Sequence, residues 1–405
     1  MDFRGSRGRV RQMFRAFASQ ASRQIACLLM VLFAHSAGAQ PAAGENTPRV
    51  CWSNAQLANV AGDERVQRMV RAAFVGPPEG ELKPYVPLSP NGVVRRVRLP
   101  ADKKLVALTF DLCEEPYEIA GYQGGIVDYL RANKIRATFF AGGKWMLTHR
   151  LRAQQLMSDP LFAVGNHTWE HRNLRLLEGK PLIDELRNAQ VAYESVREDL
   201  QEKRCVRPGQ AAPAAAAAPA RLSLVRFPFG ACNPRALEAV ANLGLLPIQW
   251  DVSSGDAPPG QSPSEMLKDV LRGVRPGSIV LFHANGRGIH TTETIPIIVA
   301  ALKEKGYEFV TVPELLQTGE PEIVPTCYDS KPGDADRYDR MAEHLEMLYR
   351  LARIRVLGND RPQSEETQAS ATAQPSLKDD AISHPKIAPS LPLSNFPLPR
   401  ARPRE

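Results

Sequence analysis

Acidic side chains follow directly after one of the apolar runs in this 405-residue chain. The run Leu105–Phe110 leads into Asp111, and Glu114 and Glu115 come shortly afterwards. A carboxylate in this position could serve as a general base in hydrolysis or bind a metal ion. The simpler interpretation is that Asp111 only caps a following helix.

Two histidines, His167 and His171, follow a second apolar run, Phe162–Gly165. Because they are four residues apart, one helical turn would place both imidazoles on the same face, as a zinc site requires. A histidine pair at this spacing is more often a chance feature of a protein surface. Its position directly after a predicted strand makes metal ligation the preferred interpretation here.

Three further apolar runs are followed by polar residues, namely Arg226, Asp251 with Asp256, and His283. A guanidinium such as that of Arg226 can pair with a carboxylate and hold it ionised. A histidine such as His283 suits general-acid chemistry, because its ordinary pKa lies near neutrality. Each residue alone would more often be structural, but five successive runs ending in such groups indicate one shared site.

The segments that position these residues alternate between short apolar runs and helical patterns, which is typical of parallel βα units. The expected strands are Leu105–Phe110, Ala137–Ala141, Phe162–Gly165, Leu224–Phe227, Leu246–Trp250, Ile279–Phe282 and Phe309–Val312. The expected helices are Ala55–Ala73, Ile126–Asn133, Lys144–Met157, Ile183–Leu200, Pro234–Asn242, Ser264–Gly273, Thr292–Lys305 and Asp336–Leu357. We predict an α/β fold, a distorted (β/α) barrel of about seven parallel strands with its site at their carboxyl ends. A doubly wound open sheet is the alternative.

The N-terminus is typical of a secretory signal. Six arginines precede the apolar run Ile25–Ala34, and Ala37-Gly38-Ala39 forms a small-residue cleavage site. The run has about half of the ~20 residues that a membrane-spanning helix needs, so we expect cleavage after Ala39 and no stable membrane span. The protein is therefore expected to be exported, to the periplasm or the extracellular space.

Charge and cysteine content limit the classes of function. Without its first 39 residues the chain loses six of 51 basic and one of 44 acidic residues, so the net charge falls from +7 to about +2. No basic stripe is apparent, and we expect no nucleic-acid partner. Cys27 would leave with the signal, and five cysteines then leave at least one free thiol. Our working assignment pairs Cys51 with Cys327 and Cys205 with Cys232, and leaves Cys113 free.

The predicted domain boundaries follow shifts in composition. They are a signal peptide over 1–39, an N-terminal extension over 40–103, a catalytic domain over 104–318 with an Ala/Pro loop insertion at 210–220, a helical extension over 319–358, and a Pro-rich disordered tail over 359–405. We expect a monomer.

The motifs, taken in this order, resemble those of the polysaccharide deacetylases, also called carbohydrate esterase family 4 or the nodulation-protein-B homology domain. The resemblance covers roughly half of the chain, from about Lys104 to Leu316. The motifs that carry it are Thr109-Phe110-Asp111, His167-x-x-x-His171, Arg226-Phe227-Pro228-Phe229-Gly230 and Leu281-Phe282-His283. As a set they are highly specific.

The resemblance implies a hydrolase that removes N-acetyl groups from an envelope or exported polysaccharide and uses one divalent metal, zinc before cobalt or nickel. It assigns the metal to His167 and His171. Asp111 would be the base for the attacking water, with Arg226 orienting it, and His283 would protonate the leaving amine. The substrate or oxyanion contacts would come from the backbone amide of Phe229 and from Trp250, Asp251 and Asp256.

Two positions depart from the family's pattern. Leu112 stands where a second Asp usually completes the metal site, and its apolar side chain cannot ligate. Glu114 is the predicted replacement, with Glu115, Cys113 or water as alternatives. Ser253 stands where an Asp usually supports the catalytic His; Asp251 lies on the same strand face and could substitute.

Two other functions stay open at this stage. The loss at Leu112 would suit a non-catalytic carbohydrate-binding protein without metal. A hydrolase of small linear or cyclic amides would keep the fold and the metal, but the signal sequence argues against it, because such metabolites are usually handled inside cells. The presence of Asp111, Arg226 and His283 together favours the polysaccharide hydrolase, since binding alone needs neither a base nor an acid.

Overall fold

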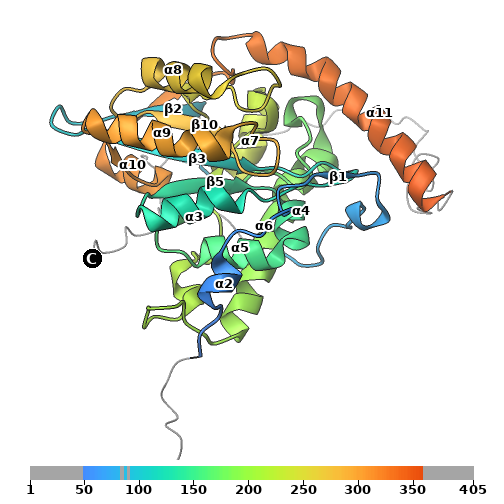
Figure 1. Ribbon diagram of the computed structural model, residues 1–405. Coiled ribbons are helices and arrows are strands. Elements are labelled where there is room, and N and C mark those ends of the chain that lie inside the picture. Colours follow the sequence, from blue (N-terminus) through green and yellow to red (C-terminus); the bar gives the residue numbers. More distant parts are fainter. Residues whose placement is uncertain (1–48, 83–85, 89–91, 359–405) are drawn as a thin grey trace, which may run out of the picture. The chain divides into compact units, whose positions relative to one another are not determined.

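Seven parallel strands form a curled half-barrel in the computed structural model, which describes residues 49–82, 86–88 and 92–358 (Figure 1). In spatial order they are β8 (Leu246–Pro247), β7 (Leu224–Val225), β6 (Phe162–Asn166), β5 (Ala137–Ala141), β3 (Leu105–Leu112), β10 (Ile279–His283) and β9 (Val252–Ser253). A further strand, β11 (Glu308–Phe309), pairs with the start of β3. The predicted barrel is therefore confirmed. The predicted signal peptide and C-terminal tail lie outside the described residues.

Strand β3 lies at the middle of this sheet and is the most buried element of the fold. All eight of its residues are buried, because β5 and β10 flank it and apolar layers cover both faces. The ring of Phe110 stacks between Phe139 and Phe282, at centroid distances of 5.3 and 5.5 Å. This packing fixes β3 firmly, and Asp111 lies near its carboxyl end.

An antiparallel ribbon of β2 (Val93–Arg98) and β12 (Glu320–Val324) lies between the two edges of the half-barrel. Val94 bridges to Ile248 beyond β8, and Arg96 bridges to Ser278 before β10. Neither strand was expected, and β12 replaces the start of the predicted helical extension. Their sequences carry charges that a strand pattern usually lacks, and here the partly buried Arg96–Glu322 ion pair joins the two strands at 2.5 Å.

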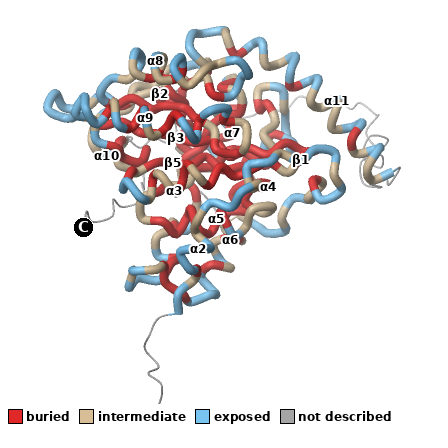
Figure 2. Tube along the Cα trace, viewed as in Figure 1, coloured by how far each residue is buried: buried red, intermediate tan, exposed pale blue. Residues whose placement is uncertain are grey.

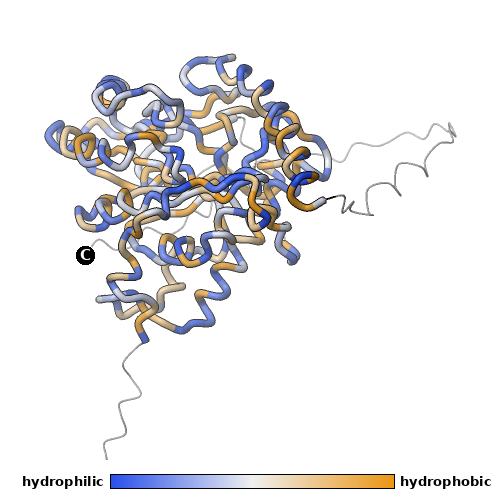
Figure 3. Tube along the Cα trace, turned by 45° about the vertical axis from the view of Figure 1, so that its right-hand side comes forward, coloured by the Kyte–Doolittle hydropathy of each residue, from blue (hydrophilic) through white to orange (hydrophobic). Residues whose placement is uncertain are grey.

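Helices follow most of the strands and cover the sheet. They are α3 (Gly124–Ala132), α4 (Gly143–Thr148), α5 (Arg150–Met157), α6 (Gly179–Glu202), α7 (Pro234–Asn242), α8 (Pro263–Gly273), α9 (Thr291–Glu304), α10 (Val312–Thr318) and α11 (Arg337–Leu357). Buried residues concentrate in the strands and exposed residues on the outer helices (Figure 2). Along those helices hydrophilic and hydrophobic positions alternate, as amphipathic covering helices require (Figure 3).

Two predicted element boundaries were wrong for local reasons. The helix expected over Lys144–Met157 is divided at His149, whose φ of −115° and ψ of 39° are not helical. The strand expected over Phe309–Val312 ends early, because Thr311 forms a capping box with Glu314 and starts α10.

The helix expected over Ala55–Ala73 was also wrong. The segment holds only the four-residue helix α2 (Asn54–Leu57), the short strand β1 (Gln67–Arg68) and the 3-10 helix η1 (Arg71–Ala73). Strand β1 pairs with β4 (Glu118–Ile119), which follows the acidic motif at the end of β3. The N-terminal segment thus contributes directly to one side of the site.

Two disulfides replace the working assignment of cysteine pairs. Cys51 is joined to Cys205, and Cys232 is joined to Cys327, while Cys113 is free as expected. The second disulfide connects the loop after the Arg226–Gly230 motif to the segment that precedes α11. Among the described residues no helix is both long enough and apolar enough to cross a membrane.

Candidate active site

The carboxyl ends of the strands surround a cavity of about 1050 Å³. Its wall includes residues from β3, from the loops after β6, β7 and β8, and from β10. Those named by the sequence motifs are Asp111, His171, Phe229, Trp250, Asp256 and His283. Side chains from distant parts of the sequence therefore converge on one face, as the barrel architecture predicts.

Asp111 is held by the buried guanidinium of Arg226. Arg226 Nη1 donates to Asp111 Oδ1 at 2.8 Å and to the hydroxyl of Thr109 at 2.8 Å. Burial lowers the pKa of Arg226, and the charge of Asp111 opposes this shift. The pairing leaves the second carboxylate oxygen, Oδ2, free to face His167, whose Nε2 lies 3.5 Å away.

Both histidines present a buried ring nitrogen without a hydrogen-bond partner in the described part of the chain. His167 Nδ1 lies 2.9 Å from the carbonyl oxygen of Arg226, so Nδ1 carries the proton and Nε2 keeps its lone pair. His171 Nδ1 is equally unpartnered. Burial lowers the pKa of both imidazoles and favours the neutral form. Unsatisfied buried atoms are rare in folded proteins, and neutral imidazole is the form that binds metal.

Cys113 brings a third donor atom to these two nitrogens. One ligand atom each from Cys113, His167 and His171 lies within 4.8 Å of the others. The thiol is buried, and the side-chain amide of Asn285 donates to its Sγ at 3.0 Å and to its carbonyl oxygen at 2.7 Å. One sulfur and two imidazole nitrogens form a donor set that suits zinc.

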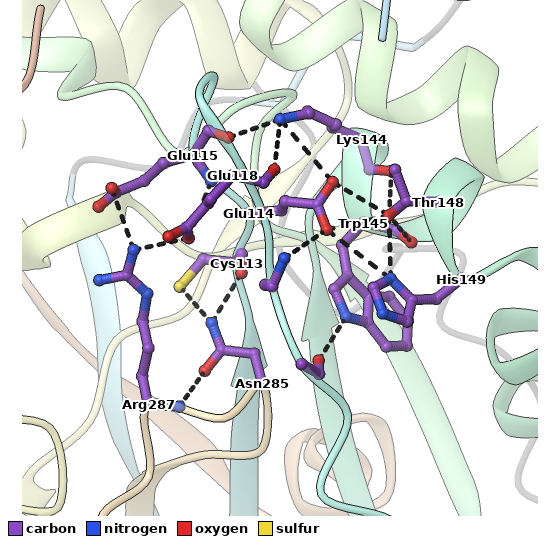
Figure 4. A network of polar contacts seen from close by, with 12 residues as sticks. Cys113, Glu114, Glu115, Glu118, Lys144, Trp145, Thr148, His149, Asn285 and Arg287 are labelled. Carbon is purple, nitrogen blue, oxygen red and sulfur yellow. Dashed lines mark hydrogen bonds and ion pairs between the residues drawn. The ribbon is translucent and has the colours of Figure 1, made fainter. Parts of the chain in front are cut away.

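Glu114 does not belong to this group, and its prediction as a metal ligand is corrected. Its carboxylate accepts hydrogen bonds from the amide of Ala120 and the hydroxyl of Thr148, both at 2.9 Å, and lies 3.8 Å from Lys144 Nζ (Figure 4). Burial raises the pKa of Glu114 to about 7, against the effect of Lys144. Side chains alternate along an extended chain, so Asp111 and Cys113 share one face and Glu114 takes the other.

His283 is supported by Asp256 rather than by Asp251. Its Nδ1 lies 2.8 Å from Asp256 Oδ1, and its backbone amide donates to Oδ2 at 2.7 Å. The hydroxyl of Thr291 also donates to Oδ2, at 2.7 Å. Burial opposes protonation of His283, but the charge and hydrogen bond of Asp256 outweigh it and raise the pKa. This is the environment of an imidazolium that can donate a proton.

Asp251, expected to contact the substrate or to support the catalytic histidine, has a structural position instead. It accepts hydrogen bonds from the hydroxyl of Ser278 and the amide of Ile279, both at 2.9 Å. It therefore fastens the start of β10 and is not part of the cavity wall. Strand-face alternation alone could not reveal this, because β9 begins only at Val252.

The aromatic residues of the site lie where the motifs placed them. The ring of Phe229 is 4.7 Å from that of His171, and its backbone is left-handed, with φ of 59°. Such strain in a non-glycine residue is common at functional sites. Trp250 donates from Nε1 to Asp329 at 3.1 Å and also faces the cavity.

The sequence analysis did not predict Arg287 as a residue of the site, nor that α11 lies beside the cavity. Arg287 faces the cavity and pairs with Glu115 at 3.0 Å and with Glu118 at 2.6 Å (Figure 4). It follows His283 by four residues in a glycine-containing loop, which is a weak signal. The helix itself was expected over Asp336–Leu357 and is present as Arg337–Leu357. Its approach to the cavity could not be predicted, because it depends on tertiary contacts.

Part of the chain is similar in sequence to a known protein family. Residues 98–248 match the family model described as polysaccharide deacetylase. This segment of the chain is therefore similar to the polysaccharide deacetylases. A chitooligosaccharide deacetylase of Azorhizobium caulinodans is 25% identical over 230 residues, which cover 53% of this chain and 96% of that protein. A peptidoglycan-N-acetylglucosamine deacetylase of Bacillus cereus is 28% identical over 224 residues, which cover 55% and 71%.

Among solved structures, a CE4-family pseudoenzyme from Bacillus anthracis is 24% identical to this chain, with a TM-score of 0.46. The match covers 58% of this chain and 72% of that one.

Proposed function

We propose that this protein is a metal-dependent hydrolase that removes N-acetyl groups from an envelope or exported polysaccharide. The observation that carries the proposal is the convergence of three units on one cavity. These are the Asp111–Arg226 pair, the donor group Cys113–His167–His171, and the His283–Asp256 pair. Together they offer a base, a metal site and an acid within one pocket, which amide hydrolysis requires.

The donor group would hold a divalent metal, preferably zinc, through Cys113 Sγ, His167 Nε2 and His171 Nδ1. A bound metal of this kind lowers the pKa of the attacking water and polarises the acetamide carbonyl. Sulfur and imidazole donors favour zinc or cobalt over magnesium and calcium, which prefer oxygen.

The protein's own residues would then move the protons. Asp111, with Oδ1 held by Arg226, accepts the proton of the attacking water on Oδ2. The water oxygen bonds to the carbonyl carbon, and the amide of Phe229 stabilises the oxygen that gains negative charge. His283 donates its proton to the nitrogen as the carbon–nitrogen bond breaks, and acetate and a free amine leave.

The two alternatives have less support. The case for a binding protein without metal rested on Leu112, which cannot bind a metal. The side chain of Leu112 packs in the hydrophobic core, and the neighbouring Cys113 turns toward the histidines and offers a donor atom in its place. The case for a small amide substrate is weakened by the cavity. At about 1050 Å³ it lies at the upper end of the range for small-molecule pockets.

The test is acetate release from N-acetylated chitooligosaccharides and from peptidoglycan by the purified protein. We expect Asp111→Asn to lower kcat by about a hundredfold to ten-thousandfold, because it removes the general base. Asp251→Asn is the matched control and should leave kcat within about threefold, since Asp251 lies outside the cavity wall. Equal activity of the wild type and Asp111→Asn would exclude Asp111 as the base.

A further inference from the structure

Helix α11 supplies part of the wall of the catalytic cavity. Tyr338, Met341 and Leu345 line the same space as Asp111 and His283. Their spacing of three and four residues places them on one face of the helix. Because α11 lies beyond residues 98–248, this wall comes from outside the segment that matches the family model.

Tyr338 lies one aromatic ring away from the metal site. Its ring centroid is 5.7 Å from that of Phe229, which in turn is 4.7 Å from that of His171. The guanidinium of Arg337 lies 4.7 Å from the centre of the Tyr338 ring, and its Nη2 donates to the Tyr338 hydroxyl at 2.8 Å. These contacts fix the orientation of the ring at the edge of the cavity.

The segment that precedes α11 is fastened to the catalytic loops. The Cys232–Cys327 disulfide ties it to the loop that carries Phe229. Asp329 accepts a hydrogen bond from Trp250 Nε1 at 3.1 Å, and the guanidinium of Arg95 donates to the backbone oxygen of Asp329 at 2.7 Å.

The helix itself is joined to the loop that follows His171. Arg172 pairs with Glu346 and Arg175 with Asp339, each at 2.6 Å. Since contacts reach it from two catalytic loops, α11 is built into the site rather than resting loosely against it.

We propose that Tyr338, together with Phe229, forms an aromatic subsite for a sugar unit next to the one that is deacetylated. The proposal rests on the function proposed above. The faces of pyranose rings carry C–H groups that pack against aromatic rings, while their hydroxyls need polar partners at the rim. Arg337 and Asp329, which also line the cavity, supply such partners. Helix α11 thus selects substrates with a second sugar unit on this side.

The test compares Tyr338→Ala with the wild type on penta-N-acetylchitopentaose and on N-acetylglucosamine. We expect KM for the pentamer to rise roughly threefold to tenfold, the loss of one aromatic contact, with kcat within about twofold. Tyr338→Phe should keep the wild-type KM, since packing does not need the hydroxyl. Tyr349→Ala is the matched control, because Tyr349 lies on the same helix but packs on Phe74, at 6.2 Å.

Binding to the Asp111→Asn protein separates this proposal from the catalytic one. Calorimetry with the pentamer should give a Kd that rises by a similar factor when Tyr338→Ala is added. If acetate is released but Tyr338→Ala changes neither Kd nor KM, the subsite is excluded and the hydrolase stands. If no acetate is released but Tyr338→Ala still weakens binding, the catalytic proposal fails and the subsite stands. An equal effect of Tyr349→Ala, or no binding of the pentamer, would overturn the subsite.

Discussion

At the scale of single residues, Leu112 departs from the family's pattern, and the neighbouring Cys113 offers the third donor atom instead. The extended chain continues past Asp111, so Leu112 and Glu114 point away from the cavity while Cys113 points into it. The motifs predicted Asp111, His167 and His171 because each lies at or shortly after the carboxyl end of a buried strand. They could not decide which residue supplies the third donor atom. The choice among Glu114, Glu115 and Cys113 depends on where the extended strand ends, because this sets which side chains point into the cavity.

Cobalt spectroscopy tests the role of Cys113. The cobalt-loaded wild type should show the near-ultraviolet absorption of a cobalt–thiolate bond, because Sγ lies with the two histidine nitrogens. Cys113→Asp should bind cobalt without this band, and Cys113→Leu should bind it at least about tenfold more weakly. A wild-type spectrum without the band would remove Cys113 from the metal site.

The pH dependence of kcat/KM tests the His283–Asp256 pair. Asp256 raises the pKa of His283, so the imidazolium needed as general acid persists to higher pH and is lost as pH rises through that pKa. Asp256→Asn removes both the charge and the charge-assisted hydrogen bond. The basic limb of the profile should therefore move to lower pH. Asp251→Asn should leave the limb unchanged, and a shift of equal size there would contradict the assignment.

At the scale of elements, burial and alternation decided what could be predicted. The apolar parallel strands β3, β5, β6 and β10 were found because most of their residues are buried. The ribbon strand β2 was missed, because three arginines in six residues hide its pattern. The charge of Arg96 is paired with Glu322 of β12, a partner strand that lies far away in the sequence.

The buried Lys144 fastens α4 to the end of β3, and its removal should destabilise the fold. Its ammonium donates to the backbone oxygens of Glu115 at 2.6 Å and Glu118 at 2.8 Å, and it pairs with Glu114 (Figure 4). Lys144→Met leaves these groups without their cation, and we expect a loss of about 3–5 kcal/mol in unfolding free energy. Denaturant unfolding measures it. Lys180→Met, at an exposed pair with Asp184, is the control and should cost about 1 kcal/mol or less.

At the scale of the whole molecule, connections between residues far apart in the sequence determine which segments line the cavity. These connections could not be predicted. The pairing of Cys232 with Cys327 spans 95 residues, and no local pattern indicates it. The same holds for the position of α11 beside the cavity. The catalytic centre could thus be outlined from the strand ends, while the wall that the C-terminal segment adds could not.

Removing each disulfide separates stability from substrate selection. The double change Cys232→Ala with Cys327→Ala should cost about 2–4 kcal/mol and also raise KM for the chitopentaose, because α11 loses its tether. Removing Cys51–Cys205 in the same way should cost a similar amount without changing KM, since that disulfide is not part of the cavity wall. Equal KM values in the two double variants would contradict the tethering role.

Zinc content measured together with acetate release tests the central claim most directly. The purified protein, loaded with zinc and then freed of excess metal, should hold one zinc per chain and release acetate from chitopentaose. A chelator should abolish both, and added zinc should restore both. A protein that binds no zinc or cobalt, or that releases acetate equally well after complete metal removal, would contradict the account.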